Sequence, residues 1–241
     1  MLFFRLTMLN VLLFLIKNRD MKIMYSYPVV LTGAEINKLN KLKGYTKIGC
    51  KSEIIAKHIL EQNPAISSCS FVTGKDNIYL GDIKLKMRGY TRKDQARYVE
   101  VKTGTLYNGR RKLCIDYKYT LKNCPDVEYK QSSTGAWVNA QYDTLIVVFS
   151  NEIYMINEGY SLLEKVQRDV ELKRLQTPNL DDDWYNIRNV EIANGLVATT
   201  NQVHAKYDTW LLSLDLDTYL DFNNINYKRI SYELVQPKRV E

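Results

Sequence analysis

The sequence has few of the residues that build metal-bound or cross-linked proteins. It contains four cysteines and two histidines, and no two cysteines have the CxxC spacing typical of structural zinc sites. His204 has no serine or cysteine partner pattern, so triad chemistry also lacks support. We therefore expect free thiols in a reducing compartment, with Cys69 and Cys114 in apolar strands. This favours an intracellular protein, cytoplasmic or nucleoid-associated, and leaves a viral source open.

Long apolar runs, internal repeats and Gly-rich phosphate loops are also missing. Residues 1–24 are the most apolar segment, but the run from Met8 to Ile16 is too short to span a bilayer. No small-residue cleavage site follows it. We expect no stable membrane insertion. The alternatives are an over-extended reading frame that truly starts at Met21 or Met24, a hydrophobic helix packed on a partner, and a weak signal anchor.

What the chain does contain suits a globular α/β protein. A length of 241 residues with 45% hydrophobic residues is enough to bury one core with elaborations. Helical and alternating apolar patterns follow one another along the chain. We expect a core over residues 25–176 and a C-terminal extension of mixed structure over residues 177–241.

The positive charge is concentrated in one part of the chain. Of the formal net charge of +7, the region from Lys84 to Lys130 carries 13 Lys and Arg against 5 Asp and Glu, so the remainder is about neutral. A clustered excess of this kind favours a polyanionic partner. A solvated charged face that serves solubility is the alternative.

The central motif is an acid, Asp82, followed 18 positions later by a Glu-X-Lys sequence, Glu100 and Lys102. Residues two apart on a strand project to the same face, so Glu100 and Lys102 point together. If residues 78–87 and 97–103 are antiparallel neighbours, Asp82 comes near Glu100. The alternative is a solvated hairpin whose face carries a surface ion pair.

Two carboxylates and an ammonium in one place have a chemical interpretation. Mg²⁺ prefers one or two carboxylates plus water and phosphate oxygens to a cage made only of protein ligands. Such a metal can activate water and offset charge on a phosphodiester, and a lysine can position the water or stabilise negative charge.

An acid, a gap and then Glu-X-Lys on a strand resembles the PD-(D/E)XK nuclease superfamily, over roughly residues 49 to 157. The resemblance implies a restriction endonuclease-like core, a central mixed sheet flanked by helices. It assigns Asp82, Glu100 and Lys102 to catalysis, with Glu53 on a preceding helix as a further acid. Gly81 stands where the family name has proline.

The resemblance also implies a cofactor and partners. Mg²⁺, with Mn²⁺ able to substitute, would be held by Asp82, Glu100 and the Val101 carbonyl. The partner would be duplex or branched DNA, and a homodimer is expected because resolvases and many restriction enzymes of this superfamily are dimers. The function that follows is hydrolysis of phosphodiester bonds in DNA, by endonuclease or exonuclease action.

Basic residues on and after the Glu-X-Lys strand are candidate phosphate contacts. Tyrosines at positions 107, 117 and 119 interleave with them, which suits base stacking and equally suits an amphipathic edge strand. The predicted DNA-binding residues are Arg97, Arg110, Arg111, Lys112 and Lys118.

Periodicity and capping signals predict the local elements. Thr32 would cap a helix from Gly33 to Lys43 that ends at Gly44, and Ser52 would cap a helix within Cys50–Gln62 that places Glu53 in its first turn. There Glu53 has an alternative role as a surface acid near the helix dipole. Further strands are expected at Ser68–Thr73, Leu113–Tyr119, Tyr142–Phe149, Ile153–Ile156, Gly195–Thr200 and Thr209–Leu216, and further helices at Gln131–Gln141 and 159–176.

Two other functions fit the same residues. The basic hairpin could belong to a nucleic-acid-binding protein without catalysis. The apolar N-terminal segment could dock a structural or assembly protein, such as one of a virus, on its partner.

Overall fold

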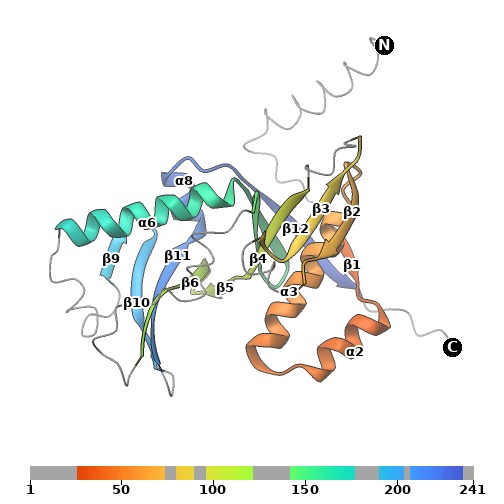
Figure 1. Cartoon of the computed structure of the whole chain (residues 1–241), viewed down its shortest axis with the longest axis horizontal. Coiled ribbons are helices and arrows are strands. Elements are labelled where there is room, and N and C mark those ends of the chain that lie inside the picture. Colours follow the sequence, from red (N-terminus) through yellow and green to blue (C-terminus); the bar gives the residue numbers. More distant parts are fainter. Residues whose placement is uncertain are drawn as a thin grey trace, which may run out of the picture.

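The computed structural model describes residues 26–73, 80–89, 96–121, 142–176, 190–203 and 207–235. Within these ranges the chain forms twelve strands in two sheets, together with four helices (Figure 1). The α/β class is confirmed. Residues 1–24, the predicted helix at Gln131–Gln141 and the side chain of Lys118 lie outside what is described.

The larger sheet has seven strands and mixed directions. Its β4–β7 and β1–β12 pairs are parallel, and its other neighbours are antiparallel. The strands lie in the order β1 (Ser26–Val30), β12 (Tyr227–Val235), β8 (Glu152–Asn157), β7 (Thr144–Val148), β4 (Arg97–Thr103), β3 (Ile83–Met87) and β2 (Ile66–Phe71).

The smaller sheet is antiparallel throughout and leaves the larger one at the end of β4. Its order is β5 (Thr105–Tyr107), β6 (Arg110–Leu121), β11 (Tyr207–Asp215), β10 (Leu196–Val203) and β9 (Val190–Ala193). Both sheets draw strands from before and after residue 176, so the expected boundary there does not separate them.

Two helices precede the first hairpin. The α2 helix (Gly33–Lys41) has the predicted cap, because the Thr32 side chain accepts from the Glu35 N–H and the Glu35 carboxylate accepts from the Thr32 N–H. Gly44 does not end this helix as expected. Instead it begins the next one, α3 (Gly44–Glu61), with a φ of 54° that favours glycine.

The α3 helix starts six residues earlier than its apolar spacing indicates, and this corrects two assignments. Ser52 is buried inside the helix and makes no cap. Glu53 lies in the third turn, too far from the N-terminus for the dipole role considered for it.

The core has two main parts, one on each face of the larger sheet. One face carries Val99 and Val101 of β4 against α3. On the other face, α6 (Gly159–Gln176) and α8 (Leu216–Phe222) share an apolar cluster with residues of both sheets, so the two sheets are joined by one core.

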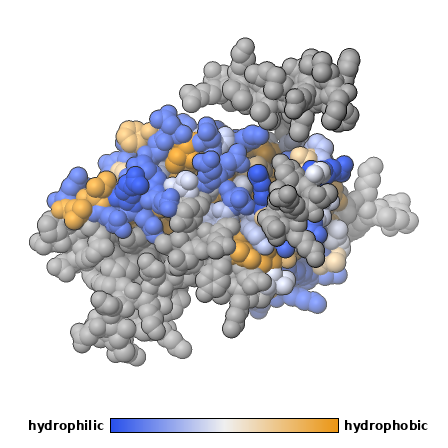
Figure 2. Space-filling view, turned by 45° about the horizontal axis from the view of Figure 1, so that its top comes forward, coloured by the Kyte–Doolittle hydropathy of each residue, from blue (hydrophilic) through white to orange (hydrophobic). Residues whose placement is uncertain are grey.

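The α6 helix has the predicted bounds and a solvent face that is mostly hydrophilic. Figure 2 shows this face with an apolar patch at one end. Leu172 and Leu175, near the C-terminal end of α6, are exposed there. No helix in the described ranges is long and apolar enough to cross a membrane.

Cys50 and Cys69 are free thiols. Cys50 is buried in α3, Cys69 is half-buried in β2, and Cys114 is exposed on β6. Cys114 lies in a strand, as predicted, but its side chain is exposed between the buried neighbours Leu113 and Ile115.

Candidate active site

Asp82 lies immediately before β3, where that strand meets β4. Its backbone N–H donates to the Val99 carbonyl at 2.9 Å, and its carboxylate Oδ2 accepts from the Val101 N–H at 2.8 Å. The side chain thus takes the place of a strand partner, because the ladder between the two strands begins at the Ile83–Val99 pair. The predicted antiparallel hairpin is confirmed, and it fixes Asp82 beside β4.

Gly81 sets the backbone immediately before Asp82. Its φ is +98°, and a Cβ built there would come within 2.9 Å of the Val99 carbonyl oxygen. Only glycine combines this backbone conformation with so close an approach to β4. Gly81 therefore sets the position from which Asp82 reaches Val101.

The end of β4 is open toward β3 over its last residues. In an extended strand the N–H and C=O of one residue point to the same side. The Val101 N–H points to Asp82, so the Val101 carbonyl faces the same gap. The Val101 carbonyl therefore lies on the same edge of β4 as the Asp82 carboxylate.

Glu100 and Lys102 form an ion pair next to this gap. The Lys102 ammonium lies 2.5 Å from Oε1 of Glu100, whose side chain is 11% exposed. Burial raises the pKa of the Glu100 carboxyl, and the Asp82 charge raises it further, whereas Lys102 lowers it. The predicted projection of Glu100 and Lys102 together is confirmed by this contact.

Glu53 approaches the same place from α3. The preceding residue, Ser52, is hydrogen-bonded to Thr103 between the hydroxyl oxygens at 2.8 Å, which ties α3 to the end of β4. Burial raises the pKa of Glu53 to about 7, with further contributions from the charges of Asp82 and Glu100, while Lys38 and Lys102 oppose the rise. The α3 helix and the hairpin therefore converge.

The structure thus pairs Glu100 with Lys102 and fixes Asp82 beside the same strand, and the charges of these three residues act on Glu53 of α3. The missed member is Lys38 of α2, whose charge acts on Glu53. The sequence does not indicate this role for Lys38, because the position of Lys38 depends on how α2 packs against α3. Among the described residues, no three His, Cys, Asp or Glu side chains are already arranged as a metal cage.

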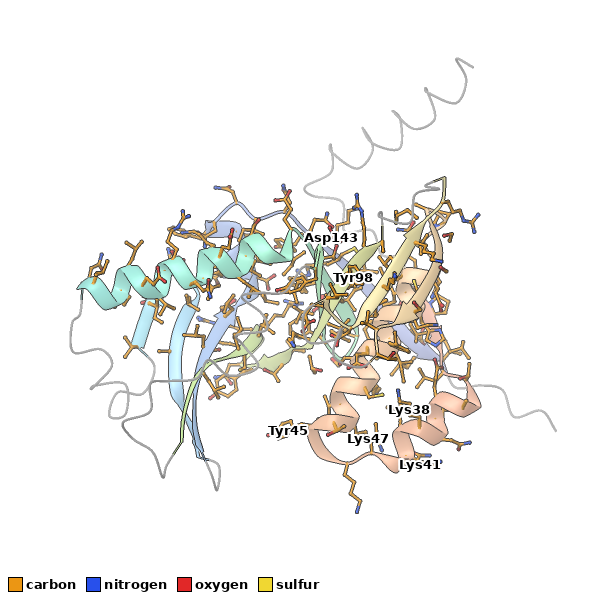
Figure 3. All side chains as sticks on the ribbon, viewed as in Figure 1. Lys38, Lys41, Tyr45, Lys47, Tyr98 and Asp143 are labelled. Atoms are coloured by element: carbon orange, nitrogen blue, oxygen red, sulfur yellow. The ribbon has the colours of Figure 1, made fainter. Side chains whose placement is uncertain are left out.

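The start of β4 is fastened by a second acid that the motif does not include. The Asp143 carboxylate accepts from the Tyr98 N–H at 2.9 Å, and the Asp143 N–H donates to the Tyr98 carbonyl at 2.9 Å (Figure 3). This reciprocal pair aligns β4 with β7. It supports the strand that carries the Glu-X-Lys residues.

The predicted DNA-binding residues differ in their surroundings. Arg97 is exposed at the start of β4, and the side chain of Arg110 is 70% exposed at 3.6 Å from Asp215. Lys112 is half-buried. Arg111 donates to the carboxylates of Glu152 and Asp217 and is only 22% exposed, so its charge is already neutralised inside the molecule.

His58, the one histidine in the described ranges, has a structural contact. Its Nε2 lies 3.1 Å from the Glu35 carboxylate and so joins α3 to α2.

Comparisons of the chain with protein-family models, with curated proteins and with solved structures give no match in any of the three.

Proposed function

We propose that this protein is a Mg²⁺-dependent nuclease that hydrolyses phosphodiester bonds in DNA. The observation that carries the proposal is the Glu100–Lys102 ion pair beside Asp82, whose carboxylate accepts from the Val101 N–H. Burial and the neighbouring charges raise the pKa of Glu53 and of Glu100, and a cation bound beside these carboxylates would offset their negative charge. Mg²⁺ with a phosphodiester substrate fits that role.

The fold supports the same proposal. A helix, α3, is followed by the antiparallel strands β2, β3 and β4, and then by β7, which lies parallel to β4. This order agrees with the restriction endonuclease-like core that the motif implies. We therefore propose that the region belongs to that architecture.

The residues fit a hard divalent cation. Asp82, Glu100 and the Val101 carbonyl offer oxygen ligands from two adjoining strands, and burial keeps the carboxylates poorly hydrated. Mg²⁺ held by them would supply Lewis acidity, both to activate water and to offset the charge that develops on the phosphodiester.

The other residues of the site have roles of their own. Lys102, held beside Glu100, places a positive charge where negative charge develops during hydrolysis. Glu53, with a pKa near 7, can exchange a proton at neutral pH and so accept one from the attacking water.

The test is cleavage of DNA by the full chain with Mg²⁺ and with EDTA. Lys102→Ala and Asp82→Asn should each lower the cleavage rate by a factor of about 10² or more, while leaving the circular dichroism spectrum of the folded chain and most DNA affinity unchanged. Lys228→Ala, an exposed lysine of β12, serves as the matched control and should cleave at the wild-type rate. Full activity in Lys102→Ala would contradict the proposal.

A further inference from the structure

We propose that the corner between α2 and α3, residues 36–52, binds a single-stranded segment of DNA and leads it to the carboxylate site. This basic corner is a different surface from the hairpin residues that the sequence motif indicated. The inference rests on the proposed function for what happens to the strand, but its binding step is testable without cleavage.

The charge of the basic corner is of one sign. Residues 36–52 contain five lysines and no aspartate or glutamate, and all five lysines are exposed. In the part of the chain that the structure describes, none of them lies within ion-pair distance of a carboxylate. The lysines are Lys38, Lys41, Lys43, Lys47 and Lys51. Phosphates are their natural counter-charges.

An aromatic ring stands among these lysines. Tyr45 is 85% exposed and Ile48 is 48% exposed, both in the first turns of α3. Figure 3 shows Tyr45 extending away from α2, with Lys38, Lys41 and Lys47 at the corner. Leaving these apolar groups in water costs free energy, which a stacked base would recover.

The exposure of Tyr45 and Ile48 follows from the length of α3. Its 18 residues extend over about 27 Å, and burial in the helix begins only at Cys50. Tyr45 and Ile48 fall on the same side of the helix as Ser52 and Ile55, which contact the sheet further along. The first turns therefore extend past the sheet and present their inner face to solvent.

The basic corner is continuous with the carboxylate site. Glu53 follows Tyr45 by eight residues on the same helix, which is about 12 Å along the axis. Lys38 is close enough to lower the pKa of Glu53. A strand that pairs its phosphates with the lysines would therefore reach the site within about two to four nucleotides.

The exposed ring selects the class of DNA. An aromatic side chain stacks on the face of a base, and that face is free only where the base is unpaired. A duplex covers its base faces and offers the lysines only phosphates. The combination of an exposed tyrosine with exposed lysines favours a single strand, such as a frayed end or the arm of a branched substrate.

The experiment measures binding of fluorescein-labelled dT20 and of a 20-base-pair duplex by anisotropy, with the full chain in EDTA. Tyr45→Ala should weaken dT20 binding about tenfold and duplex binding less than twofold, and Tyr45→Phe should retain dT20 binding. Lys43→Gln/Lys47→Gln should reduce the slope of log K against log salt for dT20 by about 1.4. Lys173→Gln/Lys228→Gln is the control and should change neither.

The outcomes separate this inference from the proposed function. Unchanged dT20 affinity in Tyr45→Ala, or equal losses on dT20 and duplex, would overturn the assignment to single strands. A slope unchanged in Lys43→Gln/Lys47→Gln would remove the basic corner as a binding surface. Wild-type protein that binds dT20 through the basic corner but never cleaves with Mg²⁺ would contradict only the nuclease proposal.

Discussion

At the scale of single residues, Glu53 links the geometry of the site to pH. Its pKa is raised from 4.5 to about 7 in the folded chain, so the folded state holds a proton that the unfolded state releases between these values. Stability therefore falls as the pH rises from about 4.5 to 7 and stays reduced above it. The ionised Glu53 carboxylate therefore destabilises the folded state at neutral and alkaline pH.

The first prediction follows from this loss of stability with rising pH. Glu53→Gln, which is neutral at every pH, should stabilise the protein at pH 8 by about 1 to 2 kcal/mol, less than the full shift implies because the side chain is partly exposed. The gain should vanish near pH 4.5. Urea unfolding in EDTA at both pH values measures it. Equal stabilities of the variant and the wild type at pH 8 would show that the pKa of Glu53 is not raised in the folded chain.

The second prediction concerns Gly81, whose backbone approach places Asp82. Gly81→Ala should destabilise the chain by about 2 to 4 kcal/mol, since it adds both the strain of a positive φ and a clash with the Val99 carbonyl. Gly89→Ala is the matched control, with a φ of +81° and open space around it, and should cost about 1 kcal/mol. Urea unfolding compares them, and equal costs would remove the role of the close approach.

The residues of the motif could be predicted because their relation is local. Glu100 and Lys102 share a strand face by spacing alone, and Asp82 needs only one hairpin to reach them. Arg111 could not be assigned in this way. Its partners, Glu152 and Asp217, are 41 and 106 residues away, and only the packing of the two sheets brings them together.

At the scale of elements, the contact between α3 and β4 decides whether Glu53 reaches the hairpin. The Ser52–Thr103 hydrogen bond joins the two elements one residue before Glu53. Ser52 is buried, so the loss of this hydrogen bond is not compensated by water.

The third prediction tests that contact by a double-mutant cycle. Ser52→Ala and Thr103→Val should each cost about 1 kcal/mol in urea unfolding, and the double variant should cost clearly less than their sum, because one bond is lost in all three. Ser67→Ala removes an exposed hydroxyl that donates to the Lys86 carbonyl, and should cost less than 0.5 kcal/mol. Additive costs of Ser52→Ala and Thr103→Val would mean that the bond does not join α3 to β4.

The start of α3 was predicted too late for a physical reason. Residues 44–49 include two glycines and a threonine, which are poor helix formers, so local preference favours a start at Cys50. The helix nevertheless extends to Gly44, where a left-handed residue turns the chain out of α2. Because α3 begins at Gly44, Glu53 lies in the third turn of the helix and not in the first turn, as the sequence had indicated.

At the scale of the whole molecule, the order of strands in the larger sheet was beyond the sequence patterns. β12 lies between β1 and β8 although about 200 residues separate it from β1 along the chain. Alternation of apolar residues indicates that a strand exists, but it does not say which partner the strand takes. The pairing of β3 with β4 could be predicted because the two strands follow one another directly along the chain.

The two sheets are also joined by a buried network of charges around Glu152. This residue, at the start of β8 and 7% exposed, accepts from Arg111 of β6 in the smaller sheet and from Arg229 of β12 in the larger one, the latter at 2.9 Å. Tyr154 lies beneath both guanidinium groups and donates to Asp217. One carboxylate therefore holds two cations that belong to different sheets.

The fourth prediction is that removing this carboxylate weakens the whole molecule, because it leaves the largely buried Arg111 guanidinium and the more exposed Arg229 guanidinium without their shared partner. Glu152→Ala should lower the free energy of unfolding by about 1 to 3 kcal/mol, and Glu152→Gln, which keeps an acceptor oxygen, should lower it by less. Lys57→Ala, which removes an exposed pair with Glu61, should cost below about 0.5 kcal/mol.

Because both sheets share one apolar core, tryptophan fluorescence and circular dichroism should follow the same urea transition in the wild type and in Glu152→Gln. Two separate transitions in Glu152→Gln would mean that the charges, and not the shared core, make the sheets fold as one unit.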